Sequence, residues 1–188
     1  MLLKIILGCN DYCNPASVGD IVPMDTKKFL KGKRVLIVDD EPDILDFLTE
    51  LLMMCKVDRA ATFEEAGAFL NNYPYNAVVL DIMGVRGYDL LEIAKKKEIS
   101  ALMLTAHALT KGDLKKSFEE GAAYFVPKEE IGKVDVYLAD IIEAREKKKN
   151  VFVKWYDRLS GFCDRRFGPD WKDEDPQFWD SLLKKNIE

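Results

Sequence analysis

The stretch Lys33-Arg-Val-Leu-Ile-Val-Asp-Asp-Glu-Pro42 decides the fold that this sequence predicts. Its run of branched apolar side chains is typical of a strand that is buried on both faces. Two adjacent carboxylates, Asp39 and Asp40, follow this run directly, and Pro42 suits the first turn of a helix. Ligands of an open parallel sheet bind beyond the carboxyl ends of its strands, so both acids are candidate metal ligands. Taken alone, they also fit a solvated loop that caps a helix.

The composition fits one ordinary domain with extensions. The chain has 188 residues and a net charge of -5, with acidic and basic residues interspersed. This charge pattern shows no cluster of basic residues of the kind that binds nucleic acid. Its 4 cysteines lack the spacing of a disulfide framework, which favours a reducing, cytoplasmic location. The apolar run at the N-terminus is interrupted by Lys4 and is too short for an export signal. No association with a membrane is expected.

Between Lys33 and Lys128 the chain alternates short apolar segments with amphipathic helical ones. Thr62 and Thr110 stand where capping residues open helices, and Gly121 stands where a helix ends. Right-handed crossovers turn such an alternation into a parallel sheet with helices on both faces. The prediction is therefore an α/β fold with a doubly wound, five-stranded parallel sheet. The expected strands are residues 34–38, 57–61, 75–81, 101–105 and 122–126.

Chemically complementary side chains lie at the ends of four of the expected strands. They are Asp39 with Asp40, Asp81, Thr105 and Lys128. Each has a simple structural explanation alone, as a helix cap, a strand-end hydroxyl or a surface charge. Their recurrence at one edge of a parallel sheet favours a functional site over coincidence.

The chemistry of these groups indicates phosphoryl transfer. Three converging carboxylates repel one another unless a hard cation such as Mg²⁺ or Mn²⁺ neutralises them. Lys128 supplies a further positive charge and Thr105 a hydroxyl, and both suit phosphoryl oxygens. A carboxylate can itself act as the nucleophile and form an aspartyl-phosphate. Asp81, on the expected central strand and beside a glycine-containing loop, is the best candidate.

Four separated motifs together resemble the receiver domains of bacterial two-component response regulators. They are Val-Asp39-Asp40-Glu-Pro, Val-Leu-Asp81-Ile-Met, Leu-Thr105-Ala-His and Gly121-Ala-Ala-Tyr-Phe-Val-Pro-Lys128, and the resemblance covers residues 33–144. It implies a flavodoxin-like receiver fold and a phosphoprotein whose Asp81 accepts a phosphoryl group from a sensor histidine kinase. It also implies that Asp39 and Asp40 hold Mg²⁺ together with Asp81 and the Met83 carbonyl.

The same resemblance implies that Thr105 and Lys128 bind the phosphoryl group and that Phe125 occupies the aromatic switch position of the family. The sequence departs from the family pattern in two places. The loop after Asp81 lacks the usual proline and looks about two residues short, and Glu129 stands where the family usually has proline. Neither change removes a reactive group, so competence for phosphorylation is expected.

The rest of the chain divides into a flexible leader, residues 1–32, and a helical, aromatic-rich extension, residues 145–188. Apolar residues continue past the expected last receiver helix, as one long rod or as a helix broken near residues 147–150. Asp175-Pro176 begins a short closing helix. All three tryptophans lie in this extension, so it must bury an apolar face. That face packs on its own receiver, joins a homodimer through the C-terminal helix, or docks on a partner protein.

The leading hypothesis is a receiver that signals through protein contacts without a recognised DNA-binding output domain. Such a protein is not expected to be an enzyme, except that it catalyses its own phosphorylation and dephosphorylation. A phosphohydrolase would need an acid two residues after Asp81, where Met83 stands. Two more functions fit the sequence: a degenerate receiver that binds partners without phosphorylation, and a transcription regulator with an unfamiliar DNA-binding tail. His107, the single histidine, is expected to be a bystander rather than a phosphocarrier. The downstream protein stays unidentified.

Overall fold

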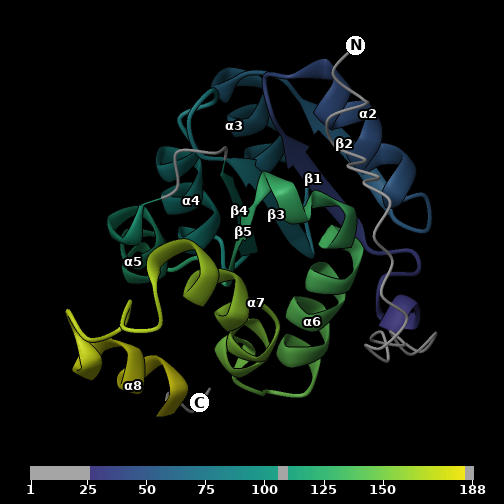
Figure 1. Ribbon diagram of the computed structural model, residues 1–188. Helices are drawn as coiled ribbons and strands as arrows, with labels where there is room; N and C mark the ends of the chain where they lie inside the picture. The colour runs from purple at the N-terminus through teal and green to yellow at the C-terminus, as the bar shows by residue number, and fades with distance from the viewer. Residues whose placement is uncertain (1–25, 106–109, 185–188) are drawn as a thin grey trace, which may run out of the picture.

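The structure is a computed structural model that describes residues 26–105 and 110–184. Strands and helices alternate up to β5, and the chain is helical after it (Figure 1). The elements are the 3-10 helices η1 (Thr26–Phe29) and η2 (Lys128–Lys133), the strands β1 (Arg34–Val38), β2 (Lys56–Ala60), β3 (Ala77–Asp81), β4 (Ser100–Thr105) and β5 (Tyr124–Pro127), and the helices α2 (Pro42–Leu51), α3 (Phe63–Asn72), α4 (Gly87–Lys96), α5 (Lys111–Glu120), α6 (Val134–Glu146), α7 (Val151–Phe167) and α8 (Pro176–Lys184).

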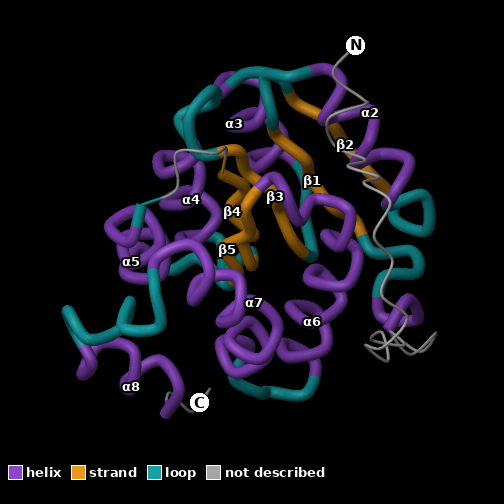
Figure 2. Tube along the Cα trace, in the orientation of Figure 1, coloured by secondary structure: helices purple, strands orange, loops and turns teal. Residues whose placement is uncertain are grey.

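The five strands form one parallel sheet in the order β2-β1-β3-β4-β5. Helices α2 and α6 pack together on one face, and α3, α4 and α5 follow one another over the other face (Figures 1 and 2). This arrangement confirms the predicted doubly wound α/β fold. Because all the strands run in one direction, their carboxyl ends lie along the same edge of the sheet, where the candidate site residues were expected.

The middle strands carry the core. Nearly every side chain of β1, β3 and β4 is buried, as expected for parallel strands covered by helices on both faces. The two edge strands differ from each other. The edge strand β2 leaves most of its side chains at least partly exposed, whereas all four residues of β5 are buried. The reason is that the C-terminal extension covers the β5 edge.

Capping residues in the sequence correctly predicted the starts of α3 and α5 and the end of α5. The hydroxyl of Thr62 accepts a hydrogen bond from the backbone N–H of Glu65 at the start of α3, and Thr110 and Asp113 form a reciprocal capping box at the start of α5. Gly121 ends α5 with a φ of 102°, a conformation that glycine adopts without strain. The observed strands shift from the predicted ranges by one or two residues at some ends.

A break separates the last receiver helix from the extension, so the broken helix is correct and the single long rod is not. Helix α6 ends at Glu146 and α7 begins at Val151. Between them, Lys148 has a φ of 50°, and the Asn150 side chain accepts a hydrogen bond from the N–H of Phe152 at the start of α7. The closing helix predicted after Asp175 is α8.

The extension packs against the α/β fold of its own chain, the first of the three arrangements that the sequence left open. Trp155, Trp171 and Trp179 are 1%, 1% and 5% exposed. The ring of Phe118 on α5 contacts the rings of Phe152 and Trp155 at centroid distances of 5.0 and 4.8 Å. The aromatic face that the sequence left without a covering partner is therefore buried within the molecule.

Residues 26–32, which fall at the end of the predicted leader, take part in this fold. Leu30 is fully buried, η1 contacts α6, and the N–H of Gly32 donates to the carbonyl oxygen of Met54. The rest of the predicted leader lies outside the described residues. Within the described part of the chain, no helix combines the length and the apolar character needed to cross a bilayer.

Candidate functional site

The side chains of Asp39, Asp81 and Lys128 meet at the carboxyl edge of the sheet. Asp39 directly follows β1, Asp81 ends β3, and Lys128 follows β5. The Lys128 ammonium nitrogen lies 2.9 Å from Asp39 Oδ2 and 3.0 Å from Asp81 Oδ1. It also donates a hydrogen bond of 2.9 Å to Oε1 of Glu41, a contact that the sequence did not suggest. One cation thus bridges carboxylates delivered by separate segments of the chain.

The loop after β3 holds the second oxygen of Asp81. The backbone N–H groups of Met83 and Gly84 donate to Asp81 Oδ2 at 2.9 and 2.8 Å. Asp40 packs directly against the same glycine, since a Cβ atom added to Gly84 would lie only 1.9 Å from Asp40 Oδ1. Gly84 therefore allows Asp40 and Asp81 to approach the same loop.

The next residues of this loop are fixed to a neighbouring helix. Arg86 adopts a left-handed conformation, with φ 55° and ψ 50°, just before α4. Its guanidinium lies 4.2 Å from the ring centroid of Phe63 on α3 and pairs with Asp89 at 2.6 Å. The loop between β3 and α4 is thus anchored by stacking and charge.

Burial and charge act in opposite directions on the pKa values of Asp39 and Lys128. Burial raises the pKa of Asp39, while the contact with Lys128 and the hydrogen bond from the Glu41 N–H act to lower it. For Lys128, burial favours the neutral form, but its contacts with the carboxylates of Glu41, Asp39 and Asp81 outweigh burial and raise its pKa above the ordinary value. The cluster therefore keeps its lysine charged at neutral pH.

The donor set fits a hard divalent cation. Asp39 Oδ2 is buried and has no hydrogen-bond donor, because the nearby ammonium group lies at ion-pair distance without hydrogen-bond geometry. The exposed Asp40 and the buried Asp81 supply further carboxylate oxygens, the ligands that Mg²⁺ prefers. No three Asp, Glu, His or Cys side chains in the described ranges are already arranged as a complete metal site. Metal binding would thus require these side chains to rearrange around the ion.

The other predicted site residues lie close to this cluster or outside the described part. Thr105 ends β4, is 6% exposed, and pairs in register with Pro127, the residue before Lys128. Phe125 is buried on β5. The side chain of Met83 is 79% exposed, and the predicted role of its carbonyl group as a metal ligand stays a prediction. His107 falls in residues 106–109, outside the described residues.

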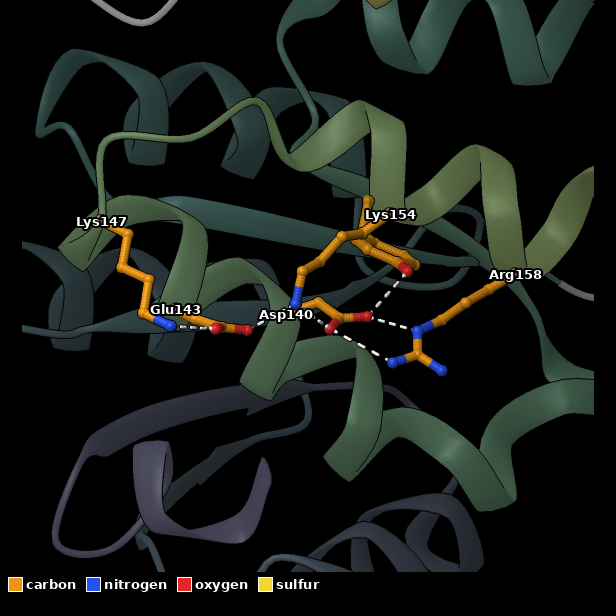
Figure 3. A network of polar contacts seen from close by, with 6 residues as sticks. Asp140, Glu143, Lys147, Lys154 and Arg158 are labelled. Carbon is orange, nitrogen blue, oxygen red and sulfur yellow. Dashed lines mark hydrogen bonds and ion pairs between the residues drawn. The ribbon is translucent and has the colours of Figure 1, made fainter. Parts of the chain in front are cut away.

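A second polar cluster, which the sequence did not reveal, joins the receiver to the extension. Asp140 on α6 is fully buried and contacts the Lys154 nitrogen at 2.9 Å and the Arg158 Nε at 2.5 Å, both from α7 (Figure 3). The Tyr124 hydroxyl of β5 also donates to Asp140, at 3.3 Å. The sequence offered no local signal for this cluster, because its contacts join residues of α6 to residues of α7 that lie 14 and 18 positions further along the chain.

A hollow of about 600 Å³ lies near the opposite edge of the sheet, where β1 and β2 begin. Its polar groups satisfy one another, since Asp58 accepts hydrogen bonds from Arg34 at 2.6 Å and from the Tyr75 hydroxyl at 2.9 Å. It contains none of the predicted site residues. The carboxyl edge of the sheet therefore remains the candidate site.

Comparisons with known proteins identify the family to which this fold belongs. The sequence profile of the response regulator receiver domain matches residues 35–139. The two-component response regulator ARR18 of Arabidopsis thaliana is 37% identical over 87 residues, which are 43% of this chain and 14% of that protein. The chain thus spans about one seventh of the length of this relative.

Solved structures show the same fold. A putative response regulator from Chloroflexus aurantiacus is 29% identical, with a TM-score of 0.54 over 60% of this chain and 99% of that one. The response regulator DrrB of Thermotoga maritima is 28% identical, with a TM-score of 0.52 over 63% of this chain and 54% of that one. The receiver domain of the Francisella response regulator 1452, 21% identical, matches in fold with a TM-score of 0.55 over 61% of this chain and 99% of that one. With the profile matching more than half of its residues, the chain belongs to the response regulator receiver domain family.

Proposed function

We propose that this protein is a phosphorylation-controlled signalling receiver whose Asp81 accepts a phosphoryl group from a sensor histidine kinase. The observation that carries the proposal is the meeting of Asp81, Asp39 and Lys128 within about 3 Å contacts at one edge of the sheet. Backbone donors and the Lys128 ammonium hold the Asp81 carboxylate in place for an attack on phosphorus. The same ammonium group can neutralise the negative charge of the phosphoryl group.

In the proposed reaction, a carboxylate oxygen of Asp81 forms a bond to phosphorus while the bond from phosphorus to the kinase histidine nitrogen breaks. The histidine leaves with the electron pair of that bond and takes up a proton. Lys128 and the Thr105 hydroxyl are proposed to bind the phosphoryl oxygens. The N–H groups of Met83 and Gly84, which already donate to Asp81, are further donors within reach of oxygens attached to that carboxylate.

Mg²⁺ or Mn²⁺ is the proposed cofactor, held by Asp39, Asp40, Asp81 and the Met83 carbonyl group. When bound, the ion supplies charge neutralisation for the acids and the phosphoryl group. The buried Asp39 oxygen without a hydrogen-bond donor supports this assignment from the protein side.

The proposed output is a change in protein contacts rather than DNA binding. The net charge of -5 gives no overall attraction to nucleic acid, and the extension after the receiver packs on the receiver itself. We propose residues 33–144 as the receiver and residues 145–188 as the extension, with a cytoplasmic location in a bacterium. Its catalysis is then limited to its own phosphorylation and dephosphorylation.

The test is incubation of the full chain with Mg²⁺ and acetyl phosphate, followed by intact mass measurement. We expect the mass gain of one phosphoryl group in the wild type and none in Asp81→Asn, which preserves shape but removes the nucleophile. Glu92→Gln, which changes an exposed acid that pairs with Lys96, is the matched control and should be labelled like the wild type.

The absence of a mass gain with acetyl phosphate and with a phosphorylated kinase would contradict the proposal. It would favour a degenerate receiver that binds partners without phosphorylation. Equal labelling of the wild type and Asp81→Asn would also contradict the assignment of the nucleophile.

A further inference from the structure

The two edges of the sheet are covered to different extents. Strands β2 and β5 form the edges (Figure 2). All four residues of β5 are buried, whereas Lys56 and Arg59 of β2 are exposed and Val57 and Asp58 are half-buried. Hollows of about 600 and 350 Å³ lie beside β2, the first lined by Lys56, Val57 and Asp58 and the second by Arg59. In the part of the chain that the structure describes, no further strand pairs with the outer side of β2.

The backbone of β2 presents polar groups on this outer side. The N–H of Lys56 donates to the carbonyl oxygen of Lys33, so Lys56 faces β1. Because alternate residues of a parallel strand bond to the same neighbour, Val57 and Arg59 point their N–H and C=O groups away from β1. Such an edge is a template for pairing with a strand of another chain.

Two side chains on one face of β2 carry opposite charges that are available to a partner. Asp58 uses a single oxygen, Oδ2, for its hydrogen bonds from Arg34 at 2.6 Å and from the Tyr75 hydroxyl at 2.9 Å. Among the described residues, no donor reaches its Oδ1, and no carboxylate pairs with the exposed ammonium group of Lys56. Residues 56 and 58 are two positions apart, so their side chains lie on the same face of the strand.

We propose that this edge is an interface between two copies of the chain, whose β2 strands pair antiparallel about a twofold axis beside Val57. In this register Val57 lies opposite the partner's Val57, and the two residues exchange backbone N–H and C=O hydrogen bonds. Lys56 lies opposite the partner's Asp58, and by symmetry Asp58 lies opposite the partner's Lys56. The interface therefore combines paired backbone groups with two ion pairs.

The order of the charges along β2 selects this register. Charged side chains on an edge strand ordinarily oppose pairing with another chain. An axis beside Lys56, Asp58 or Arg59 would place like charges directly opposite each other, which is unfavourable. An axis beside Val57 places opposite charges together and an apolar pair at the centre. The sequence lysine, valine, aspartate is thus complementary to itself, which favours a second copy as the occupant of this edge.

The proposed dimer leaves the candidate site of each subunit open. Antiparallel pairing joins the two sheets edge to edge, so their carboxyl edges point in opposite directions. The extension lies at the β5 side of each sheet, away from the interface. The inference therefore goes beyond the proposed function and does not depend on it, since the dimer forms without phosphorylation.

The direct test is sedimentation of the full chain, without a phosphodonor, at concentrations up to about 100 µM, which suits the small interface of one strand from each subunit. We expect the wild type to form a dimer. Lys56→Glu places carboxylates opposite each other twice, so the dissociation constant should rise at least about 10-fold. Lys97→Glu makes the same charge change at an exposed lysine at the end of α4 and should dimerise like the wild type.

Mixing two variants tests the ion pair itself. Asp58→Lys should also weaken the dimer, because it places two ammonium groups opposite each other. In a mixed dimer of Asp58→Lys with Lys56→Glu, both opposing pairs regain opposite charges. We expect the mixture to sediment as a dimer at concentrations at which each variant alone is a monomer.

A cysteine variant tests the register and leaves the contact of Asp58 with Arg34 intact. Opposite residues of a hydrogen-bonded antiparallel pair have Cα atoms about 5.5 Å apart, a distance that a disulfide can span. Val57→Cys should therefore form a cross-linked dimer under mild oxidation, with the two copies of position 57 joined in the digested protein. Lys97→Cys should give no cross-link at its own position.

Three results would overturn the inference. A wild type that stays monomeric at every concentration would show that this edge does not pair. Equal weakening of the dimer by Lys56→Glu and Lys97→Glu would place the interface elsewhere. Slow amide hydrogen exchange of Val57 and Arg59 that does not depend on protein concentration would show that a segment of the same chain covers the edge. Each of these results would leave the proposed function of Asp81 unaffected.

Discussion

The Nε atom of Arg158 lies 2.5 Å from Oδ2 of Asp140, a carboxylate with no exposed surface (Figure 3). The pair joins α7 of the extension to α6 of the receiver, and Lys154 adds a second cation to the same acid at 2.9 Å. Intact buried pairs add little net stability, but removing one partner leaves an uncompensated charge inside the protein. The joint between receiver and extension therefore depends on Asp140.

We predict that Asp140→Ala lowers the free energy of unfolding by about 1–3 kcal/mol, because the buried Tyr124 hydroxyl and the Arg158 guanidinium lose their acceptor. Urea denaturation followed by circular dichroism measures the change. Asp180→Ala removes an acid from an exposed pair with Lys184 at 3.6 Å, and should cost less than about 1 kcal/mol. A similar small loss for both variants would show that the buried acid is not essential to the joint.

The neighbouring acid Glu143 predicts a dependence of stability on pH. Hydrogen bonds from Lys147 and then from Lys154 lower its pKa from the ordinary 4.5 to about 2. Because the folded protein holds the charged form more strongly than the unfolded chain does, this contribution is complete above the ordinary pKa. It is lost as the pH falls from there toward 2.

Urea denaturation of the wild type and Glu143→Gln at a series of pH values measures this contribution. The wild type should be more stable than the variant at pH 6, and the difference should shrink toward zero as the pH falls through the window between the two pKa values. A difference that stays constant across this window would contradict the assignment.

Gly84 predicts a defect in the site without a defect in the fold. In Gly84→Ala the new Cβ atom would lie 1.9 Å from Asp40 Oδ1, so Asp40 must leave its position. We expect Mg²⁺ affinity, measured by calorimetry, to fall by roughly 10-fold or more, as for other changes that displace metal ligands. Gly132→Ala has no atom within 4 Å of its added Cβ and should bind Mg²⁺ normally. Unchanged affinity in Gly84→Ala would remove Asp40 from the proposed ligand set.

Lys128→Met should separate metal binding from phosphoryl transfer. The ammonium group competes with a metal ion for the oxygens of Asp39 and Asp81, so its removal should strengthen binding of Mg²⁺. The same change removes a charge that stabilises the transferring group, and phosphorylation by acetyl phosphate should slow by roughly 100-fold. Lys96→Met, at an exposed lysine of α4, is the control for both measurements. A variant that loses metal binding as well would mean that Lys128 mainly organises the acids.

The sheet and the strand-end residues were predictable because their signals are local. Buried parallel strands are continuous apolar runs, and the parallel topology brings the ends of such strands to one edge. Asp39, Asp81 and Lys128 could therefore be assigned to one site from the sequence alone. The contact of Glu41 with Lys128 was not predictable, since it depends on the rotamers of two long side chains.

The position of the extension could not be predicted for a different reason. Helical periodicity shows which face of a helix is apolar, but several surfaces are able to cover that face. The decisive contacts, from Trp155 to the Phe125 carbonyl group and from Arg158 to Asp140, are specific pairings between distant segments. Only the folded arrangement identifies such pairings.

The measurement that tests the proposed function most directly is chemical mapping of the phosphorylated residue. Borohydride reduces an aspartyl-phosphate to homoserine, and tandem mass spectrometry of the digested protein locates the change. After treatment with acetyl phosphate and Mg²⁺, we predict homoserine at position 81 and unchanged aspartates at positions 39 and 40. Homoserine at either of those two positions, or at none of the three, would contradict the assignment of Asp81 as the phosphoryl acceptor.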